Sequence, residues 1–260
     1  MPHPSTTAET YPHKPAIIMG ATDEMVTYRQ LDQRSNQGAQ LFRSLGLQAG
    51  DHIALMLENN ARFLEICWAA QRAGLIFTPI ATHLKREEVA YVLANCDAGL
   101  FIGSHKLLDA ATAAREDATG VTHFYMAGGI TDGYESWEEA LLDQPETPVE
   151  DEKNGVPMLY SSGTTGQPKG VFVPPADDDV NTPPMATNLG QLFGFGEETV
   201  YLSPAPLYHA APLPYNMMTL YQGGTTVIMD KFDPVAALAL VEEHRATHSQ
   251  WVPIMFIRML

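Results

Sequence analysis

The sequence predicts an α/β fold with parallel sheets. Short apolar runs alternate with amphipathic helical patterns along most of the chain, and glycine follows the first two helical patterns. Strands separated by helices pair in parallel, because each helix returns the chain to the edge of the sheet at which the previous strand began. The chain has 260 residues, 45% of them hydrophobic and 18% charged, a composition typical of globular domains.

Local signals place the elements of the first half. Thr27 and Gln30 have the spacing of a capping box, so the first helix should begin there and end at Gly46. The elements expected next are strands over 53–57, 75–80, 100–102 and 121–126, alternating with helices over 62–73, 85–95, 107–115 and 137–142. A polar, proline-bearing stretch at 144–155 is the best candidate for a surface linker and for a sub-division of the chain.

The second half continues the same alternation. Asp233 is expected to cap a helix that has Pro234 at its first position. The elements expected here are strands over 156–160, 171–173, 200–202, 225–229 and 249–252, with helices over 215–221, 234–244 and from 253 onward. The final helix is apolar and lacks a capping glycine. We therefore expect further chain to cover it, and interpret the C-terminus as a truncation.

Charge and composition exclude several classes of protein. Lys and Arg total 15 against 31 Asp and Glu, a formal charge of -16, and no run of basic residues occurs, so nucleic acid is not an expected partner. The segment 199–229 has no charged residue but contains four prolines, so it is not a transmembrane helix. Cys67 and Cys96 lie in apolar surroundings and should be buried thiols. Without a signal peptide, the expected location is cytoplasmic.

The segment 160–171 is the most informative part of the sequence. It reads Tyr-Ser-Ser-Gly-Thr-Thr-Gly-Gln-Pro-Lys-Gly-Val, with hydroxyls, glycines and one lysine between two apolar runs. Glycines allow backbone N–H groups to approach an anion, hydroxyls add donors and lysine adds charge, so a polyphosphate could bind there. The usual nucleoside-triphosphate loop is excluded, because Pro168 and Gly170 flank the lysine.

The placement of basic residues supports this interpretation. Between Arg115 and Lys231 the only basic side chains are Lys153 and Lys169, and Lys169 lies within the glycine-hydroxyl segment. An acidic protein that binds a polyphosphate needs local positive charge. On composition alone, a surface turn rich in Ser, Thr and Gly is supported equally well.

The order of residues over 161–170 resembles the phosphate-binding signature of the adenylate-forming (AMP-binding) superfamily. That superfamily includes acyl-CoA synthetases, peptide-synthetase adenylation domains and beetle luciferases. The segments 26–31, 72–80 and 207–210 are similar to three further motifs of the family, in the same order. The resemblance covers the whole chain and is greatest to the N-terminal half of acyl-CoA synthetases and fatty-acid–CoA ligases.

The resemblance implies a fold and a reaction. Residues 1–260 would be layered parallel-sheet subdomains of the large N-terminal AMP-binding domain, without the C-terminal lid domain. Family members join a carboxylic acid to AMP, release pyrophosphate, and pass the acyl group to a thiol. The implied substrates are ATP, coenzyme A and a carboxylic acid, with Mg²⁺ beside the phosphates. A homo-oligomer is left open.

The resemblance also implies site residues, with Thr164, Thr165 and Lys169 as the chief phosphate contacts. The full phosphate-binding set is Ser161, Ser162, Gly163, Thr164, Thr165, Gly166, Lys169 and Gly170. The acid pocket would be lined by Tyr208, His209 and Ala210; without the resemblance, core packing of this Tyr-His pair would be favoured. His209 stands where amino-acid-activating relatives have Asp, so an apolar acid is expected rather than an α-amino acid.

Two departures from the family limit these expectations. Asp177, Asp178 and Asp179 follow the loop, and a solvated turn is favoured there over a metal site. The family's Mg²⁺-binding Glu, ribose-binding Asp and catalytic Lys have no candidate in this chain, so no catalytic or metal residue is assigned. The alternatives are an adenylation module, an oxidative relative, and a shortened homologue that binds without catalysis. An unrelated phosphohydrolase is disfavoured, because no acidic partner motif is found.

Overall fold

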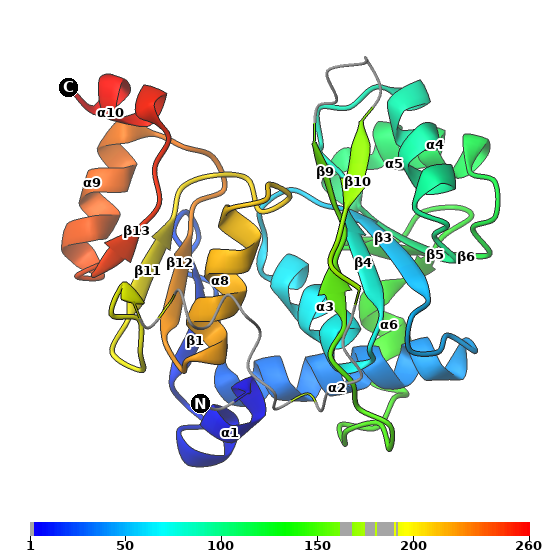
Figure 1. The fold of residues 1–260 in the computed structure, drawn as a ribbon, viewed down its shortest axis with the longest axis horizontal. Helices are drawn as coiled ribbons and strands as arrows, with labels where there is room; N and C mark the ends of the chain where they lie inside the picture. Colours follow the sequence, from blue (N-terminus) through cyan, green and yellow to red (C-terminus); the bar gives the residue numbers. More distant parts are fainter. Residues whose placement is uncertain (1–2, 162–167, 175–179, 181–189, 191) are drawn as a thin grey trace. The chain divides into compact units, whose positions relative to one another are not determined.

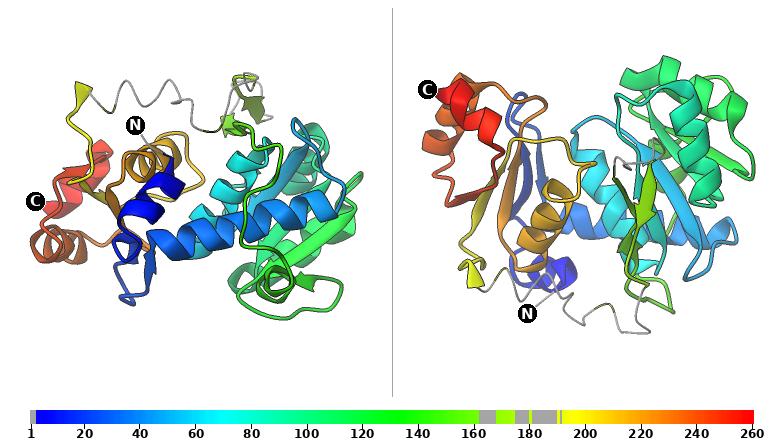
Figure 2. Two further views of the ribbon diagram at one scale, coloured as in Figure 1. Left: turned by 90° about the horizontal axis from the view of Figure 1, so that it is seen from below. Right: turned by 45° about the horizontal axis from the view of Figure 1, so that its top comes forward.

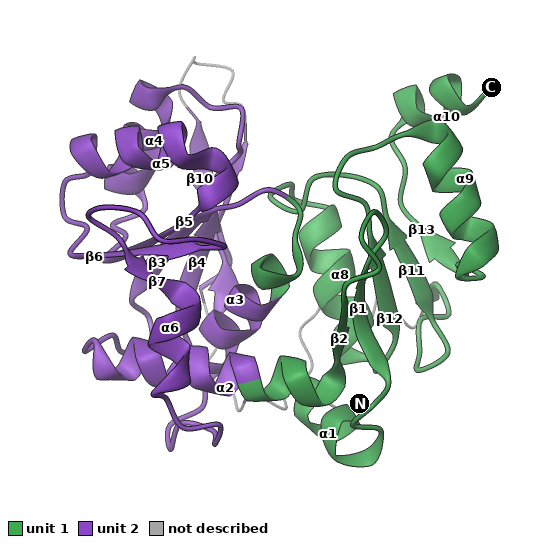
Figure 3. Cartoon of the chain, turned by 180° about the vertical axis from the view of Figure 1, so that it is seen from behind, with its two compact units in different colours: residues 1–33, 59–64, 181–260 green, residues 34–58, 65–180 purple. Residues whose placement is uncertain are grey.

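The computed structural model describes residues 3–161, 168–174, 180, 190 and 192–260. The chain divides into two compact units, which Figure 3 distinguishes by colour. Unit 1 comprises residues 1–33, 59–64 and 181–260, and unit 2 comprises residues 34–58 and 65–180. Each unit is built around a mainly parallel sheet with helices packed against it (Figure 1), so the predicted α/β class is confirmed.

The sheet of unit 2 is entirely parallel. Its six strands lie in the order β7-β6-β5-β3-β4-β8. Their bounds are β3 His52–Met56, β4 Ile76–Pro79, β5 Leu100–Ser104, β6 His123–Ala127, β7 Glu135–Ser136 and β8 Val156–Pro157. The central strand β3 pairs with both neighbours, Ile53 lying opposite Phe77 on β4 and Leu100 on β5. The inner strands β4 and β5 are buried throughout and mostly apolar, as expected for a parallel sheet covered on both faces.

Helices cover the two faces of this sheet (Figure 2). Their bounds are α2 Tyr28–Ser44, α3 Ala61–Arg72, α4 Arg86–Asn95, α5 Leu108–Asp117 and α6 Trp137–Leu142, with a short 3-10 helix η1 at His105–Leu107. Alternate strand residues point to opposite faces. Phe101 packs in the core cluster with residues of α4 and α5, whereas Tyr125 contacts the Trp137 ring of α6. Gly103 lets α5 approach β5, since a Cβ there would lie 2.9 Å from Ala111 Cβ.

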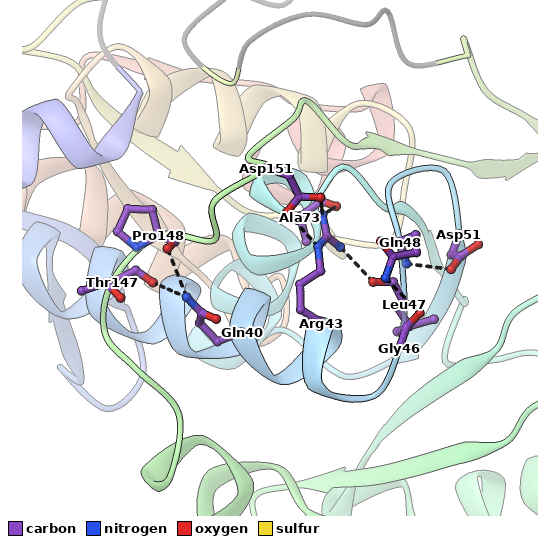
Figure 4. Close-up of polar contacts among 10 residues, drawn as sticks. All are labelled: Gln40, Arg43, Gly46, Leu47, Gln48, Asp51, Ala73, Thr147, Pro148 and Asp151. Carbon is purple, nitrogen blue, oxygen red and sulfur yellow. Dashed lines mark hydrogen bonds and ion pairs between the residues drawn. The ribbon is translucent and has the colours of Figure 1, made fainter.

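The stretch 144–155 is exposed at residues 145–148, 150 and 151 and runs along α2 within unit 2 (Figure 4). The Arg43 guanidinium donates to both carboxylate oxygens of Asp151 at 3.1 Å and to the Ala73 carbonyl at 2.8 Å. The Gln40 amide donates to the Thr147 carbonyl at 2.9 Å. These bonds fasten the stretch to α2, and a sub-division of the chain at this point stays a prediction.

The sheet of unit 1 is mixed. Its strand order is β13-β11-β12-β1-β2, and only the β1–β2 pair is antiparallel. The elements are α1 Pro4–Thr10, β1 Pro15–Met19, β2 Met25–Thr27, β11 Val200–Ser203, α8 Pro212–Tyr221, β12 Thr225–Ile228, α9 Pro234–Glu243, β13 His248–Ser249 and α10 Pro253–Met259. The N-terminal strand β1 lies beside β12, with Ile17 opposite Thr226. Strand β1 was not among the strands expected from the sequence.

Most local predictions are confirmed. The Thr27 N–H donates to Gln30 Oε1 at 2.9 Å, and Asp233 Oδ1 accepts from the N–H groups of Val235 and Ala236. Gly46 and Gly74 follow α2 and α3 with φ of +87° and +70°, values that favour glycine. Cys67 and Cys96 are buried free thiols, and burial raises the pKa of both. Among the described residues, no helix combines the length and the apolar character that crossing a membrane requires.

Some predicted strands are wrong in their extent. The strand expected over 249–252 is β13, which covers only His248–Ser249. The expected strand over 156–160 is two strands, β8 and β9 (Leu159–Ser161). Met158 N–H still donates to the Phe77 carbonyl, at 2.9 Å, but β9 then pairs antiparallel with β10 (Lys169–Val171). The second strand of this pair also begins two residues earlier than the expected 171–173. The turn of the chain away from the parallel sheet therefore occurs at Met158.

A buried amide in unit 1 fixes the segment that precedes α8. Asn59 is 6% exposed. Its Nδ2 donates to the carbonyls of Ala205 and Met229 at 3.1 and 2.8 Å, and its Oδ1 accepts from Leu207 N–H at 2.8 Å. Because three backbone groups depend on one side chain, its loss would leave them buried without partners.

We predict that Asn59→Ala lowers the free energy of unfolding by about 2 to 4 kcal/mol, because three hydrogen bonds are lost in a buried site. Urea denaturation of the 260-residue chain measures this. Gln222→Met is the matched control: Gln222 is 4% exposed, and its side-chain amide has no partner among the described residues. The control should leave the midpoint unchanged or raise it. Equal losses in both variants would contradict the role of the Asn59 hydrogen bonds.

We also predict a pH dependence from His52, at the start of β3. Burial lowers the pKa of His52 below its ordinary value, against the opposing charges of Asp97 and Asp51. Below the unfolded pKa of about 6.5 the unfolded chain therefore binds more protons at this site, so stability falls as pH drops through that range. His52→Gln should lose less stability than the parent between pH 7.5 and 5.5 in urea titrations. Equal losses in parent and His52→Gln would refute this.

Candidate functional site

The glycine-hydroxyl segment joins the two strands of a β-hairpin in unit 2. Strands β9 and β10 pair antiparallel, with Ser161 opposite Lys169, Tyr160 opposite Gly170 and Leu159 opposite Val171. The predicted phosphate contacts Ser162, Gly163, Thr164, Thr165 and Gly166 lie outside the described residues. The structure therefore brings together Ser161 and Lys169, the residues at which the predicted loop begins and ends.

The hairpin is attached to the body of unit 2 on one face. Met158 belongs to the buried core cluster, and Tyr160 and Phe172 pack against that cluster. The Tyr160 hydroxyl donates to Asn95 Oδ1, in the last residue of α4, at 2.6 Å. Burial raises the pKa of Tyr160 well above its usual value, so the hydroxyl stays a donor through the physiological range. Ser161 and Lys169 are exposed beyond this attachment.

Gly170 is required where β10 crosses the Tyr160 ring. A Cβ on Gly170 would lie 2.1 Å from Met158 Cε and 3.0 Å from Tyr160 Cζ. The methionine end can move, but the hydrogen bond to Asn95 restrains the tyrosine ring. The absence of a side chain at 170 therefore lets β10 lie directly over the ring.

Lys169 differs from several other basic residues of the chain in its electrostatic surroundings. Among the residues that the structure describes, Lys169 makes no ion pair. Arginine and lysine side chains elsewhere are paired with carboxylates: Arg34 with Glu65, Arg43 with Asp151, Arg62 with Glu24, Arg72 with Glu152, Arg86 with Asp117 and Lys106 with Glu58. The exposed ammonium at the end of the hairpin is therefore not neutralised by these carboxylates.

The predicted acid-pocket residues lie in unit 1, between β11 and α8. Tyr208 is half-buried, whereas His209 and Ala210 are exposed. The Tyr208 and His209 rings are 4.5 Å apart between centroids at an interplanar angle of 58°. His209 N–H donates to the Pro206 carbonyl at 3.2 Å, and the buried Asn59 holds Leu207 next to it. This segment is a surface turn with a fixed backbone, so His209 is not part of the packed core.

The apolar run 199–229 is mostly the interior of unit 1. Its large apolar side chains are fully buried: Leu202, Leu207, Leu213, Leu220, Val227 and Ile228. The polar Asn216 inside it donates to Ser203 Oγ and the Pro212 carbonyl, both at 2.8 Å, and accepts from the Thr226 hydroxyl. These side chains pack α8 against β11 and β12. The composition of the run is therefore explained by packing and gives no information about the substrate.

Two surface hollows lie away from the predicted residues. One, of about 550 Å³, is lined in unit 1 by residues 10–14 with Glu197 and Glu198. The other, of about 620 Å³, lies in unit 2 where β5 and β6 end, and is lined by Arg86, His105, Leu108, Asp109, Thr112, Ala113, Glu116, Ile130, Thr131 and Asp132. Neither includes the hairpin residues or Tyr208 to Ala210.

The sequence alone did not indicate the residues that anchor the predicted site. Asn95 ends α4, 65 residues before its partner Tyr160, and Asn59 lies 148 residues before Leu207. No periodicity or spacing connects residues so far apart. Tyr160 adjoins the loop motif, but its hydrogen bond could be found only from the folded structure.

The comparison with known proteins identifies the family. A model of the AMP-binding enzymes matches residues 5–260. The chain belongs to the AMP-binding enzyme family. This confirms the resemblance to that family predicted from the sequence.

Named relatives and solved structures agree. Crotonobetaine/carnitine–CoA ligase of Escherichia coli O9:H4 (strain HS) is 30% identical over 261 residues, which cover 95% of this chain and 50% of the relative. The Shigella dysenteriae serotype 1 (strain Sd197) protein of the same name is 31% identical over 266 residues, covering 97% and 50%. The chain thus spans about half the length of the curated relatives it matches.

Two solved structures are similar across nearly all of this chain. The N-terminal domain of FACL13 from Mycobacterium tuberculosis matches with a TM-score of 0.82 and 25% identity, covering 100% of this chain and 65% of that one. Apo MatB from Rhodopseudomonas palustris matches with a TM-score of 0.75 and 26% identity, covering 99% and 51%. The predicted fold of an adenylate-forming N-terminal domain is confirmed by these matches.

We predict that Gly170→Ala distorts the hairpin, because the new methyl group would meet the Met158 and Tyr160 side chains. Overpacking of this kind costs about 1 to 3 kcal/mol. Faster amide hydrogen exchange in β9 and β10 and a lower urea midpoint are the expected results. Gly196→Ala is the control, since a Cβ there meets nothing within 4 Å and its φ is not positive. If the β9 and β10 amides exchange as slowly in Gly170→Ala as in Gly196→Ala, Gly170 does not lie close to the Met158 and Tyr160 side chains.

Proposed function

We propose that this chain serves in an ATP-dependent acid–thiol ligase that converts a carboxylic acid to its coenzyme A thioester. The carboxylate oxygen attacks the α-phosphorus of ATP, and pyrophosphate leaves to give the acyl-adenylate. The thiol sulfur of coenzyme A then attacks the acyl carbon, and AMP leaves. The mixed anhydride is needed because a free carboxylate is a poor electrophile.

The observation that supports this proposal best is the hairpin that ends at Ser161 and Lys169. The family motif lies between two paired strands, and its lysine is exposed without a carboxylate partner among the described residues. We assign to the segment 161–170 the binding of the β- and γ-phosphates. Lys169 would neutralise charge that builds up on the departing pyrophosphate, which lowers the barrier of the first step.

Mg²⁺ would accompany the phosphates of ATP, since it normally keeps water and substrate oxygens as ligands. We assign it no protein ligand in this chain. Among the described residues, no group of three or more His, Cys, Asp and Glu side chains is arranged to hold a metal ion. Asp177, Asp178 and Asp179 lie outside those residues.

We assign the acid pocket to Tyr208, His209 and Ala210, which follow β11 on a backbone fixed by Asn59. An exposed His209 at this place offers no carboxylate for a substrate ammonium group, which favours an acid without an α-amino group. The names of the relatives, which are CoA ligases, favour thioester formation over a peptide-synthetase adenylation module.

We predict that the 260-residue chain binds Mg²⁺–ATP and that Lys169→Ala weakens this binding. Loss of a charged hydrogen bond costs about 1.5 to 3 kcal/mol, or roughly 10- to 150-fold in Kd. Isothermal titration calorimetry measures the change. Lys153→Ala is the matched control, because Lys153 is the other basic residue between Arg115 and Lys231 but lies outside the hairpin. Equal affinities of the two variants would refute the role of Lys169.

We further expect no acid-dependent ATP–pyrophosphate exchange from these 260 residues alone, because no catalytic lysine is assigned among them. A protein that joins this chain to the remaining family motifs should catalyse the exchange with a range of carboxylic acids. Isotope exchange into ATP measures both. Robust exchange by the 260-residue chain would contradict the first expectation. No exchange by the longer protein would favour a homologue that binds without catalysis.

A further inference from the structure

We infer that Tyr160 is a positioning residue for ATP binding: through its hydrogen bond to Asn95 it holds the stem of the β9–β10 hairpin, and with it Ser161 and Lys169, in one arrangement. The inference rests on the proposed function, since it concerns how the same phosphate site is held. Tyr160 itself is not assigned a contact with ATP.

The stem needs support from outside the hairpin. Strands β9 and β10 have three residues each and form a separate two-stranded sheet. A two-stranded hairpin alone is at best marginally stable in water, so such a pair stays ordered only when it packs on something else. The order of the residues that begin and end the loop therefore depends on tertiary contacts of the stem.

Tyr160 supplies the polar part of that support. Among the described residues of the hairpin, its hydroxyl makes the only side-chain hydrogen bond, 2.6 Å to Asn95 Oδ1 at the end of α4. The ring packs against the core cluster that contains Val92 and Cys96 of α4 and the segment after it. A ring fixed both by packing and by a directional bond has little freedom to rotate.

The fixed ring is coupled to the strand that carries Lys169. Tyr160 lies opposite Gly170, and the backbone of Gly170 passes so near the ring that a Cβ would lie 3.0 Å from Cζ and 3.1 Å from Oη. Lys169 is the neighbour of Gly170 and the cross-strand partner of Ser161. A shift of the ring toward β10 would therefore press on the backbone next to the lysine, so the bond to Asn95 restrains Lys169 although it does not touch it.

A ring contact of Phe172 positions the end of β10, but it cannot replace the hydrogen bond between Tyr160 and Asn95. Phe172, just after β10, meets the His52 ring edge-on at 6.0 Å between centroids. Ring contacts of this kind are weak and tolerate sliding. The Tyr160–Asn95 bond thus sets the angle of the stem, and Phe172 adds burial.

The experiment compares Mg²⁺–ATP affinity with stability in Tyr160→Phe, which removes only the hydroxyl. We expect Kd to rise about 2- to 12-fold, the effect of one net hydrogen bond. Hydrogen exchange of the β9 and β10 amides should also become faster. Asn95→Ala should do the same, the double variant should add nothing further, and Asn95→Asp, which keeps an acceptor oxygen, should restore affinity.

Tyr134→Phe is the matched control. The Tyr134 hydroxyl also donates a 2.6 Å hydrogen bond within unit 2, to the Ala111 carbonyl, but away from the hairpin. This variant should lose stability with no change in Kd. If Tyr160→Phe behaves like Tyr134→Phe, Tyr160 is merely structural and the inference is wrong. If the parent chain does not bind Mg²⁺–ATP at all, the proposed function fails first, and the inference fails with it.

Discussion

The strongest constraint on this protein is that the parallel sheet of unit 2 must be covered on both faces. Its inner strands are mostly apolar and are buried on both sides, so helices are needed above and below them, and the chain of this unit alternates between strand and helix to supply them. The alternation ends at β8, an edge strand, where Pro157 has no N–H to donate. The Val156 N–H still donates to the carbonyl of Leu75, just before β4, and the Met158 N–H to the carbonyl of Phe77 within it. The chain can therefore leave the sheet here, and β9 and β10 form the hairpin that holds the family motif.

The fold was predictable wherever the determining interactions are local. Capping by Thr27 with Gln30 and by Asp233, and the glycines after α2 and α3, depend on residues a few positions apart. Strand β1 was not predicted, and its pairing with β12 joins segments that are far apart in the sequence. The split of 156–160 into β8 and β9 was missed because the apolar pattern is continuous there. Only the change of pairing partner, from β4 to β10, separates the two strands.

The chemistry of the candidate site could be predicted from the sequence, but the hydrogen bonds that hold its segments in place could not. The order of residues from Ser161 to Gly170 was sufficient to indicate the family, because glycines, hydroxyls and a lysine in that order are specific. The bonds from Asn95 to Tyr160 and from Asn59 to Leu207 join distant segments, which no spacing in the sequence could indicate. The apolar run 199–229 shows that composition alone can be unspecific. Its lack of charged residues does not by itself separate a substrate pocket from a core, and only the burial of Leu213 and Leu220 in unit 1 shows that packing explains it.

The burial of both thiols has a practical consequence. Cys67 and Cys96 are the chain's two cysteines, and burial raises the pKa of each, so little reactive thiolate is accessible to solvent. A single cysteine introduced on an exposed strand end would react with maleimide dyes far faster than either native residue. Fluorescent or spin labels could therefore be attached at one chosen position without first removing the native cysteines.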